Sequence, residues 1–248
     1  MRTKQATLIA FCLLLAPAGR AGLFLLSDNR SVSVSGYARG IDGSTNYSYA
    51  QSPPSPFSTF NGSTVGLADW ADESHWPGYP AGFSHADSQC SQVSSFMADG
   101  FSMHSTLRGQ SWIAPWMPPY CDASAFAGSV FEITFSVDTP QTFSLVGAVQ
   151  RFNADVELSL ISYHHGTIIG PPDGYPFAYS GVLEPDTYVL QFDQSLQTLA
   201  DPLGDLRSVD ATLDFQLTAA PEPSVLSLGL LAVLFTLRPL MNSRKRTG

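Results

Sequence analysis

The stretch Val130-Phe131-Glu132-Ile133-Thr134-Phe135-Ser136-Val137 alternates apolar and polar side chains over its whole length. Successive side chains of a β-strand point to opposite faces, so a period of two predicts a strand with one face toward a core and the other toward water. The next four residues, Asp138-Thr139-Pro140-Gln141, are of types that favour turns. This pattern predicts a half-buried strand followed by a reversal of the chain.

Similar signals occur on both sides of this strand. We expect further strands at Ser31–Tyr37, Asn46–Tyr49, Ser94–His104 (interrupted at Asp99 and Gly100), Phe143–Val146, Val156–Leu160, Phe177–Val182, Thr187–Phe192 and Val209–Leu217. Residues 51–60 and 170–174 predict loops, and Leu183-Glu184-Pro185-Asp186 predicts a tight hairpin. No amphipathic helical pattern separates the strands. The sequence therefore predicts an all-β fold over residues 22–220, an antiparallel β-sandwich with a jelly-roll-like arrangement of two sheets.

The C-terminal segment, residues 221–248, differs from the strand-rich region before it. It begins with Pro221-Glu222-Pro223-Ser224, where two prolines fix the backbone and remove two N–H donors, so an extended segment is expected. The uncharged run Val225–Leu237 follows, and a helix over residues 225–241 would measure about 25 Å against roughly 30 Å of bilayer hydrocarbon. The terminal cluster Arg244-Lys245-Arg246 should stay in the cytoplasm. This order predicts a short transmembrane helix with everything before Ser224 outside.

This tail resembles the PEP-CTERM sorting signal of Gram-negative bacteria, in which Pro-Glu-Pro, an apolar span and an Arg-rich end follow one another. The resemblance covers residues 221–246, with the departure that Arg238 stands apart from the basic cluster. It implies cleavage near Pro-Glu-Pro by an integral-membrane exosortase, after transient anchoring in inner-membrane lipid. Release or transfer to the cell surface would follow. It also implies an association with exopolysaccharide and the biofilm matrix.

The N-terminus predicts a secretory signal peptide over residues 1–21. Arg2 and Lys4 precede an eleven-residue apolar core, Ala6–Ala16, and small residues follow it. We expect cleavage after Ala21, with cleavage after Ala18 as the alternative. Because the next residues, Leu23–Leu26, are apolar, an uncleaved anchor stays open as well.

The charge of the region between the two terminal signals limits its partners. Residues 22–220 hold five arginines, no lysine and twenty acidic residues, which gives a net charge of −15. Nucleic acid is an unsuitable partner because no basic patch could replace the counterions of its phosphates. A neutral sugar, a divalent cation or a cationic surface remains compatible with this charge, as does a role in solubility alone.

Cys90 and Cys121 are the cysteines that remain after removal of the signal peptide. In an oxidising exported compartment such a pair predicts a disulfide. Two free thiols, or half of a metal site, are the alternatives. No second Cys or His stands at the close spacing of a zinc ligand pair, so we expect no metal.

Two groups of aromatic residues are candidates for binding sugar. The first contains Trp70, Trp76 and Tyr79, with His75 and Phe83 nearby, and the second contains Trp112 and Trp116, followed by Tyr120. Aromatic rings stack on the C–H faces of sugars while neighbouring polar groups bind hydroxyls. The competing interpretation is that these rings fill the end of the sandwich or cover a long loop.

Other polar residues do not form a recognisable motif. Asp69, Asp72, Glu73, His75, His85 and Asp87 lack the spacing of a calcium loop. His164-His165 is expected to be a surface turn, because adjacent strand residues point to opposite faces. The chain has no Gly-x-Ser-x-Gly, His-Glu-x-x-His or phosphate-binding glycine motif. We therefore expect no cofactor and a non-enzymatic surface or matrix protein; the alternative is a secreted polysaccharide-active enzyme or carbohydrate-binding protein.

Overall fold

The computed structural model describes residues 23–40, 43–71, 83–113, 121–170, 176–199 and 203–219. The predicted signal peptide with its cleavage site at Ala21, and the sorting segment 221–248 with its apolar span, lie outside these residues. Contacts between Cα atoms group Gly22–Thr218 into one compact unit. Among the described residues, no helix has the length and apolar character needed to cross a membrane.

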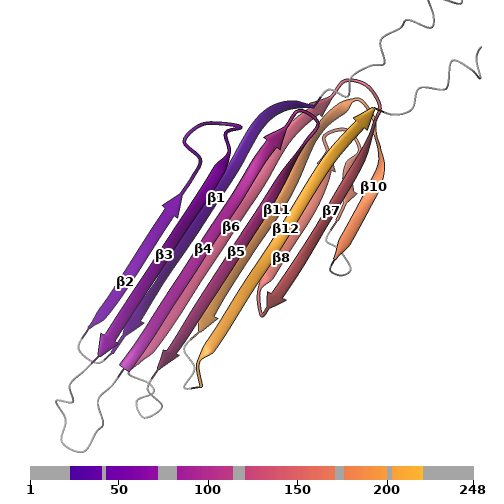
Figure 1. Ribbon diagram of the computed structural model, residues 1–248. Helices are drawn as coiled ribbons and strands as arrows, with labels where there is room; N and C mark the ends of the chain where they lie inside the picture. The colour runs from indigo at the N-terminus through magenta and orange to yellow at the C-terminus, as the bar shows by residue number, and fades with distance from the viewer. Residues whose placement is uncertain are drawn as a thin grey trace, which may run out of the picture. The chain divides into compact units, whose positions relative to one another are not determined.

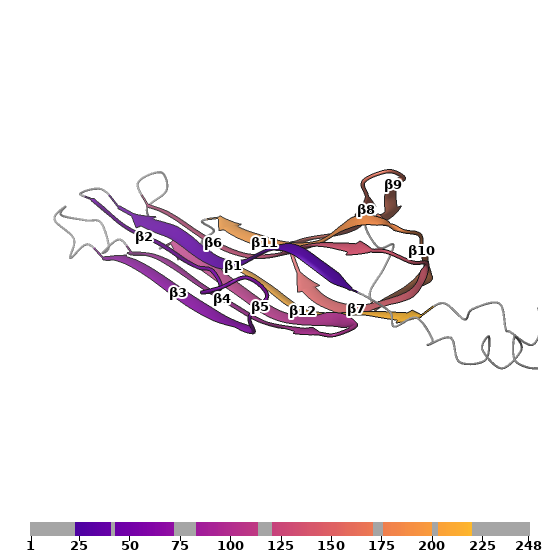
Figure 2. The same cartoon turned by 90° about the horizontal axis from the view of Figure 1, so that it is seen from above.

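Within these residues the chain forms twelve β-strands in two six-stranded sheets (Figure 1). Sheet A has the order β2-β1-β6-β11-β8-β9, with β2 at Ser44–Gln51, β1 at Phe24–Arg39, β6 at Asp122–Val137, β11 at Asp186–Leu199, β8 at Asp155–Ser162 and β9 at Gly166–Ile169. Sheet B has the order β10-β7-β12-β5-β4-β3, with β10 at Phe177–Leu183, β7 at Gln141–Phe152, β12 at Asp205–Ala219, β5 at Gly100–Ile113, β4 at Phe83–Met97 and β3 at Phe60–Ala71. Figure 2 shows the two sheets as separate layers. The predicted all-β fold with two antiparallel sheets is confirmed.

Strand β6 carries the alternating stretch with which the sequence predicts the fold. Phe131, Ile133, Phe135 and Val137 are buried, whereas the polar residues between them are half-buried on the other face. β1 and β11 flank β6 in antiparallel register, so this strand lies in the interior of sheet A. The alternation therefore distinguishes the inner face of the sheet from its outer face, as expected.

The core between the sheets changes in character along the strands. At one end it is aromatic: the rings of Phe101 and Phe215 stack with centroids 4.8 Å apart, and Phe135 lies 5.2 Å from Phe215. At the other end most inner residues are small, and Ala86, Ala123 and Ala125 form a second buried cluster there with Cys121 and Ile113. Small inner residues differ little in hydropathy from the polar residues of the outer face. Strands at this end are therefore hard to recognise from the sequence.

Several strands are longer than the sequence predicts, and two strands, β3 and β9, were missed. β3 contains Gly62 and Gly66 at inner positions, so its buried face lacks the apolar side chains that mark a strand. The predicted strand Ser94–His104 combines the end of β4 with the start of β5, and its interruption at Asp99 is the turn between them. The predicted loop between β2 and β3 is confirmed, since residues 52–59 contain no strand.

The hairpin predicted at Leu183-Glu184-Pro185-Asp186 is wrong. β10 pairs with β7 in sheet B, whereas β11 lies between β6 and β8 in sheet A. The short connection therefore crosses from one sheet to the other. The Tyr188 hydroxyl donates a hydrogen bond to the carbonyl oxygen of Glu184 at 2.7 Å, which ties the connection to β11. A sequence with turn-forming residues between two strands does not reveal whether the strands pair or change sheets.

The predicted disulfide between Cys90 and Cys121 is also wrong. The Cys90 thiol donates a hydrogen bond to the carbonyl oxygen of Gly128 at 3.1 Å, and the two cysteines are not bridged. Cys121 precedes Gly128 by seven residues of extended chain, a distance of about 23 Å, whereas a disulfide needs Cα atoms roughly 4 to 7 Å apart. Burial raises the pKa of the Cys90 thiol to about 12, so this side chain acts as a small core residue.

A buried ion pair joins β1 to its surroundings at the aromatic end. The side chains of Asp28 and Arg30 are 2% and 0% exposed, with a carboxylate oxygen 2.6 Å from a guanidinium nitrogen. Arg30 also donates a hydrogen bond to Ser94 of β4 at 3.1 Å, and its guanidinium lies 4.8 Å from the centre of the Phe96 ring. The Asp28 carboxylate accepts a hydrogen bond from the backbone N–H of Phe57 at 3.2 Å, which holds the β2–β3 loop against the core.

Candidate functional site

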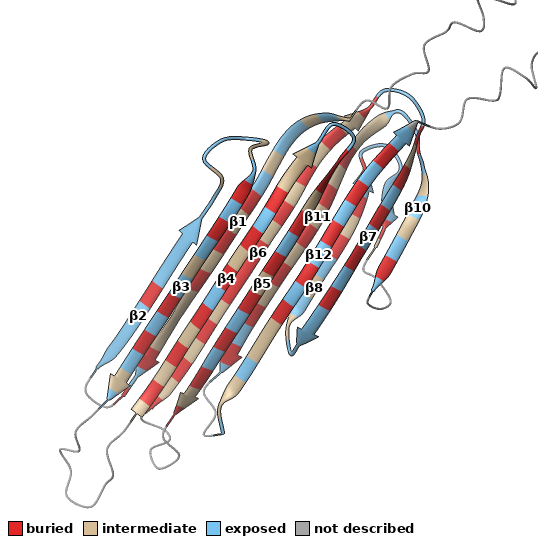
Figure 3. Cartoon of the chain, in the orientation of Figure 1, coloured by how far each residue is buried: buried red, intermediate tan, exposed pale blue. Residues whose placement is uncertain are grey.

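The outer face of sheet B is the surface on which polar and aromatic side chains gather. Along β3, β4, β5 and β12, buried inner residues alternate with half-buried or exposed outer ones (Figure 3). The strand registers place the outer residues in rows across the sheet. Three such rows are Asp69, His85 and Trp112; Val65, Gln89, Arg108 and Ser208; and Ser63, Ser91, Thr106 and Asp210.

One end of this face carries a stacked aromatic pair. The rings of Phe83 on β4 and Trp112 on β5 lie with centroids 4.4 Å apart at an interplanar angle of 28°. The imidazole of His85 lies 6.1 Å from the Trp112 ring and 6.3 Å from the Phe83 ring. All three side chains are half-buried at outer positions, so the group presents ring surface to solvent at the sheet end.

His85 lies between two carboxylates. Its Nδ1 is 2.6 Å from an oxygen of Asp69 on β3, and its Nε2 is 3.1 Å from an oxygen of Asp87 on β4. Burial by itself lowers the pKa of His85, but hydrogen bonds to Asp69 and Asp87 and the charges of both carboxylates outweigh it, so the pKa is raised. The two carboxylates thus favour protonation of His85 relative to a free imidazole.

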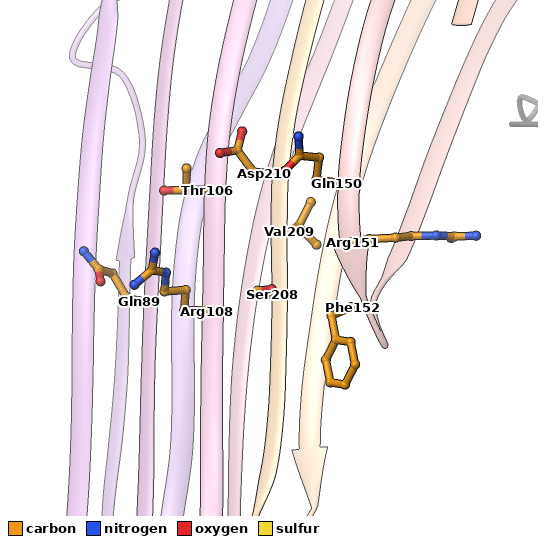
Figure 4. A pocket seen from close by; sticks show the side chains of 9 residues that line it. All are labelled: Gln89, Thr106, Arg108, Gln150, Arg151, Phe152, Ser208, Val209 and Asp210. Atoms are coloured by element: carbon orange, nitrogen blue, oxygen red, sulfur yellow. The ribbon is translucent and has the colours of Figure 1, made fainter. Parts of the chain in front are cut away.

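An open cleft occupies the middle of the same face (Figure 4). Its volume is about 570 Å³, which lies in the range of small-molecule sites. The lining residues come from β4, β5, β12 and the end of β7: Gln89, Thr106, Arg108, Gln150, Arg151, Phe152, Ser208, Val209 and Asp210. Most of these groups donate or accept hydrogen bonds, and Phe152 is 56% exposed. The cleft therefore offers neutral polar groups and one accessible ring.

The charged side chains of the cleft differ in whether they contact other protein groups. Asp210 accepts a hydrogen bond from His104 Nε2 at 3.1 Å if that nitrogen carries the proton. Figure 4 shows the Arg151 side chain directed away from Gln89 and Arg108. Arg108 is exposed, and within the described residues no hydrogen bond or ion pair engages its guanidinium. Arg108 is thus the available cation of the cleft.

The aromatic residues predicted to bind sugar do not lie on one surface. Trp70 is at an inner position of β3, where it packs against the core, and a Cβ added to Gly40 would lie 2.0 Å from its ring atoms. Trp112 points to the outer face instead. For Trp70 the core-filling interpretation is correct. Trp76, Tyr79 and Trp116 lie outside the described residues, so their prediction stays untested.

Three of the polar residues considered for metal binding, Asp69, His85 and Asp87, contact one another. Among the described residues, no group of three or more His, Cys, Asp or Glu side chains is arranged to hold a metal ion. Asp69, His85 and Asp87 come together as the ion-paired row described above, while Asp72, Glu73 and His75 lie outside the described residues.

The predicted surface turn at His164-His165 is confirmed, with both residues exposed. It is held by Asp186, whose carboxylate accepts hydrogen bonds from the Ser162 hydroxyl and, at 3.1 and 2.7 Å, from the backbone N–H groups of His164 and Thr187. Burial alone raises the pKa of Asp186, but these hydrogen bonds and a 2.5 Å contact to His164 Nδ1 hold that pKa well below its ordinary value.

Sequence reasoning missed the cleft because its strands give a weak signal. The outer residues Thr106, Arg108 and Trp112 of β5 alternate with inner Ser105, Leu107, Gly109 and Ser111. Three of these four inner residues are small, so hydropathy does not alternate clearly over the second half of β5. The alternation of large polar with small residues was the available signal.

No family model, curated protein or solved structure matches this chain.

Proposed function

We propose that this chain is an exported cell-surface or extracellular-matrix protein, sorted by its C-terminal segment and associated with exopolysaccharide. Three features of the sequence support this: the Pro221-Glu222-Pro223 tail with its apolar span and basic end, the predicted signal peptide, and a lysine-free acidic region between them. The position of β12 is compatible with this role, because this last described strand ends at Ala219, two residues before Pro221 in the sequence.

The jelly-roll-like connection of the sheets belongs to the same proposal. The order of the strands supports it. The chain alternates between sheet B and sheet A from β5 to β8, and it alternates between them again from β10 to β12. Such crossings at every step are typical of two-sheet jelly rolls.

We further propose that the exported unit binds polysaccharide along the outer face of sheet B, without cleaving it. The main support is the stacked Phe83–Trp112 pair, which is half-buried at one end of the outer face of sheet B. The same face is polar and contains the open cleft. Stacked rings supply apolar contact for sugar faces, and the Gln, Ser and Thr side chains along β4 and β5 supply hydrogen bonds for hydroxyls. A polysaccharide is an extended ligand, which suits a site that runs along strands.

The full-length chain, purified in detergent, provides the test. It is passed through affinity gels that contain neutral or acidic polysaccharides, and the same mixtures are assayed for new reducing ends. We expect retardation by at least one polymer with no new ends, and a loss of affinity of about tenfold for Trp112→Ala. Tyr163→Ala, at a 69% exposed position on the β8–β9 turn, is the control and should bind as the unaltered chain does. Absence of retardation by every polymer, or release of new ends, would overturn the proposal.

A further inference from the structure

We propose that the cleft on the outer face of sheet B binds the carboxylate of an acidic sugar through Arg108, so that the preferred polysaccharide is a polyuronate. This inference rests on the proposed polysaccharide binding and names the class of sugar. It assigns an anionic ligand to a protein whose exported region carries a net charge of −15.

The position of Arg108 is unusual among the cations of this region. Arg30 and Arg39 belong to β1 of sheet A. Arg151 and Arg207, on β7 and β12, share the inner register with buried Val149 and Val209. Since residues 22–220 contain no lysine, Arg108 supplies the one cationic Arg or Lys side chain at an outer position of sheet B within the described residues. The one arginine at an outer position of sheet B, among the described residues, therefore lines the cleft.

The carboxylates nearest the cleft are already engaged, whereas Arg108 is not. Asp210 contacts His104, and Asp87 contacts His85, in each case at 3.1 Å. No ion pair joins Arg108 to Asp210, although both line the cleft. An exposed guanidinium without a carboxylate partner, in a unit with four times as many acidic as basic residues, is available to a carboxylate that arrives with a ligand.

The groups around Arg108 suit a sugar that bears a carboxylate. A guanidinium presents donors in a planar fork that matches the two oxygens of a carboxylate. The register places Gln89 and Ser208 directly beside Arg108, and both can bind hydroxyls. Phe152, across the cleft, offers an exposed ring for the apolar face of a sugar. An isolated inorganic anion would use the guanidinium but not these neighbours.

The test compares two polymers with the same backbone, polygalacturonate and its methyl-esterified form, in binding to the full-length chain. We expect tighter binding of polygalacturonate, and a loss of at least about tenfold in that affinity for Arg108→Gln, the size expected for a hydrogen bond to a charged group. Arg108→Lys keeps the charge but loses the planar guanidinium, so its affinity for polygalacturonate should lie between those of the unaltered chain and Arg108→Gln. Arg39→Gln removes the same charge from sheet A and should bind as the unaltered chain does.

The outcomes separate this inference from the proposed function. One contradicting result is that both polymers bind equally, and that both affinities are lost in Trp112→Ala but kept in Arg108→Gln. This result would overturn the carboxylate site and leave the proposed polysaccharide binding intact. Equal losses in Arg108→Gln and Arg39→Gln would show a general charge effect and would also overturn it. If neither these nor any other polysaccharide is retained, both proposals fail.

Discussion

At the scale of single residues, the buried pair of Asp28 and Arg30 makes a sharp prediction. Asp28→Asn leaves the Arg30 guanidinium buried beside Phe96 without a counter-charge. Breaking a buried pair from one side typically costs about 3–5 kcal/mol, because the remaining charge is uncompensated. We expect a loss of that size in the free energy of unfolding measured by urea denaturation. The double variant Asp28→Leu/Arg30→Met, which removes both charges, should recover much of the lost free energy. A loss below about 1 kcal/mol in Asp28→Asn is the size typical of an exposed ion pair and would contradict the prediction.

His85 gives a second prediction at this scale. Its pKa is raised by Asp69 and Asp87, so an NMR titration should give a value above the ordinary 6.5. A raised folded-state pKa contributes stability that is fully present below pH 6.5 and is lost as the pH rises through the folded-state value. Asp69→Asn/Asp87→Asn should lower the pKa of His85, whereas Asp155→Asn on sheet A should not. A value at or below 6.5 in the unaltered chain would contradict the ion-paired row.

At the scale of strands, the contact of β2 with its neighbours depends on two glycines. A Cβ added at Gly66 would lie 2.0 Å from ring atoms of Tyr47, and one added at Gly36 would lie 2.6 Å from its hydroxyl oxygen. Tyr47 also hydrogen bonds Ser88 at 2.9 Å across the two sheets. We expect Gly66→Ala to lower the free energy of unfolding by about 1–3 kcal/mol, as overpacking does. Gly170→Ala, with no atom within 4 Å of its added Cβ, is the matched control and should change stability little. Equal effects of the two substitutions would contradict the packing of Tyr47.

The strands also show how far the sequence predicts the fold. Where inner residues are large and apolar, as at Phe131, Ile133 and Phe135, the period of two locates the strand and its faces. Where inner residues are Gly, Ser or Ala, as in β3 and the second half of β5, the same geometry leaves no hydropathy signal. The sheet change after Leu183 and the separation of Cys90 from Cys121 depend on contacts far apart in sequence, which local patterns do not carry. The grouping of aromatic residues in the sequence did indicate Trp112 as a candidate for binding sugar. That Trp112 lies at an outer position and Trp70 at an inner one follows from the strand register, which the sequence does not show.

At the scale of the whole molecule, the tail predicts the fate of the protein. In a cell with exosortase activity, replacing Pro221-Glu222-Pro223 by alanines should keep the chain in the inner-membrane fraction, because the predicted cleavage would fail. The unaltered chain should appear at the surface or in the medium, with a mass that lacks the apolar span. Fractionation followed by mass spectrometry measures both. Release of the triple-alanine variant at the normal mass would contradict sorting through this segment.

The most direct test of the central claim, that the outer face of sheet B binds polysaccharide, is a comparison of dissociation constants for the two faces. The full-length chain is titrated with the polymer it retains, as the unaltered protein, as Phe83→Ala/Trp112→Ala, and as Phe126→Ala at an outer position of sheet A. We expect the double variant to lose at least about tenfold in affinity, while Phe126→Ala keeps it, because ring stacking is lost only on the binding face. Full affinity in the double variant, or an equal loss in Phe126→Ala, would contradict the claim.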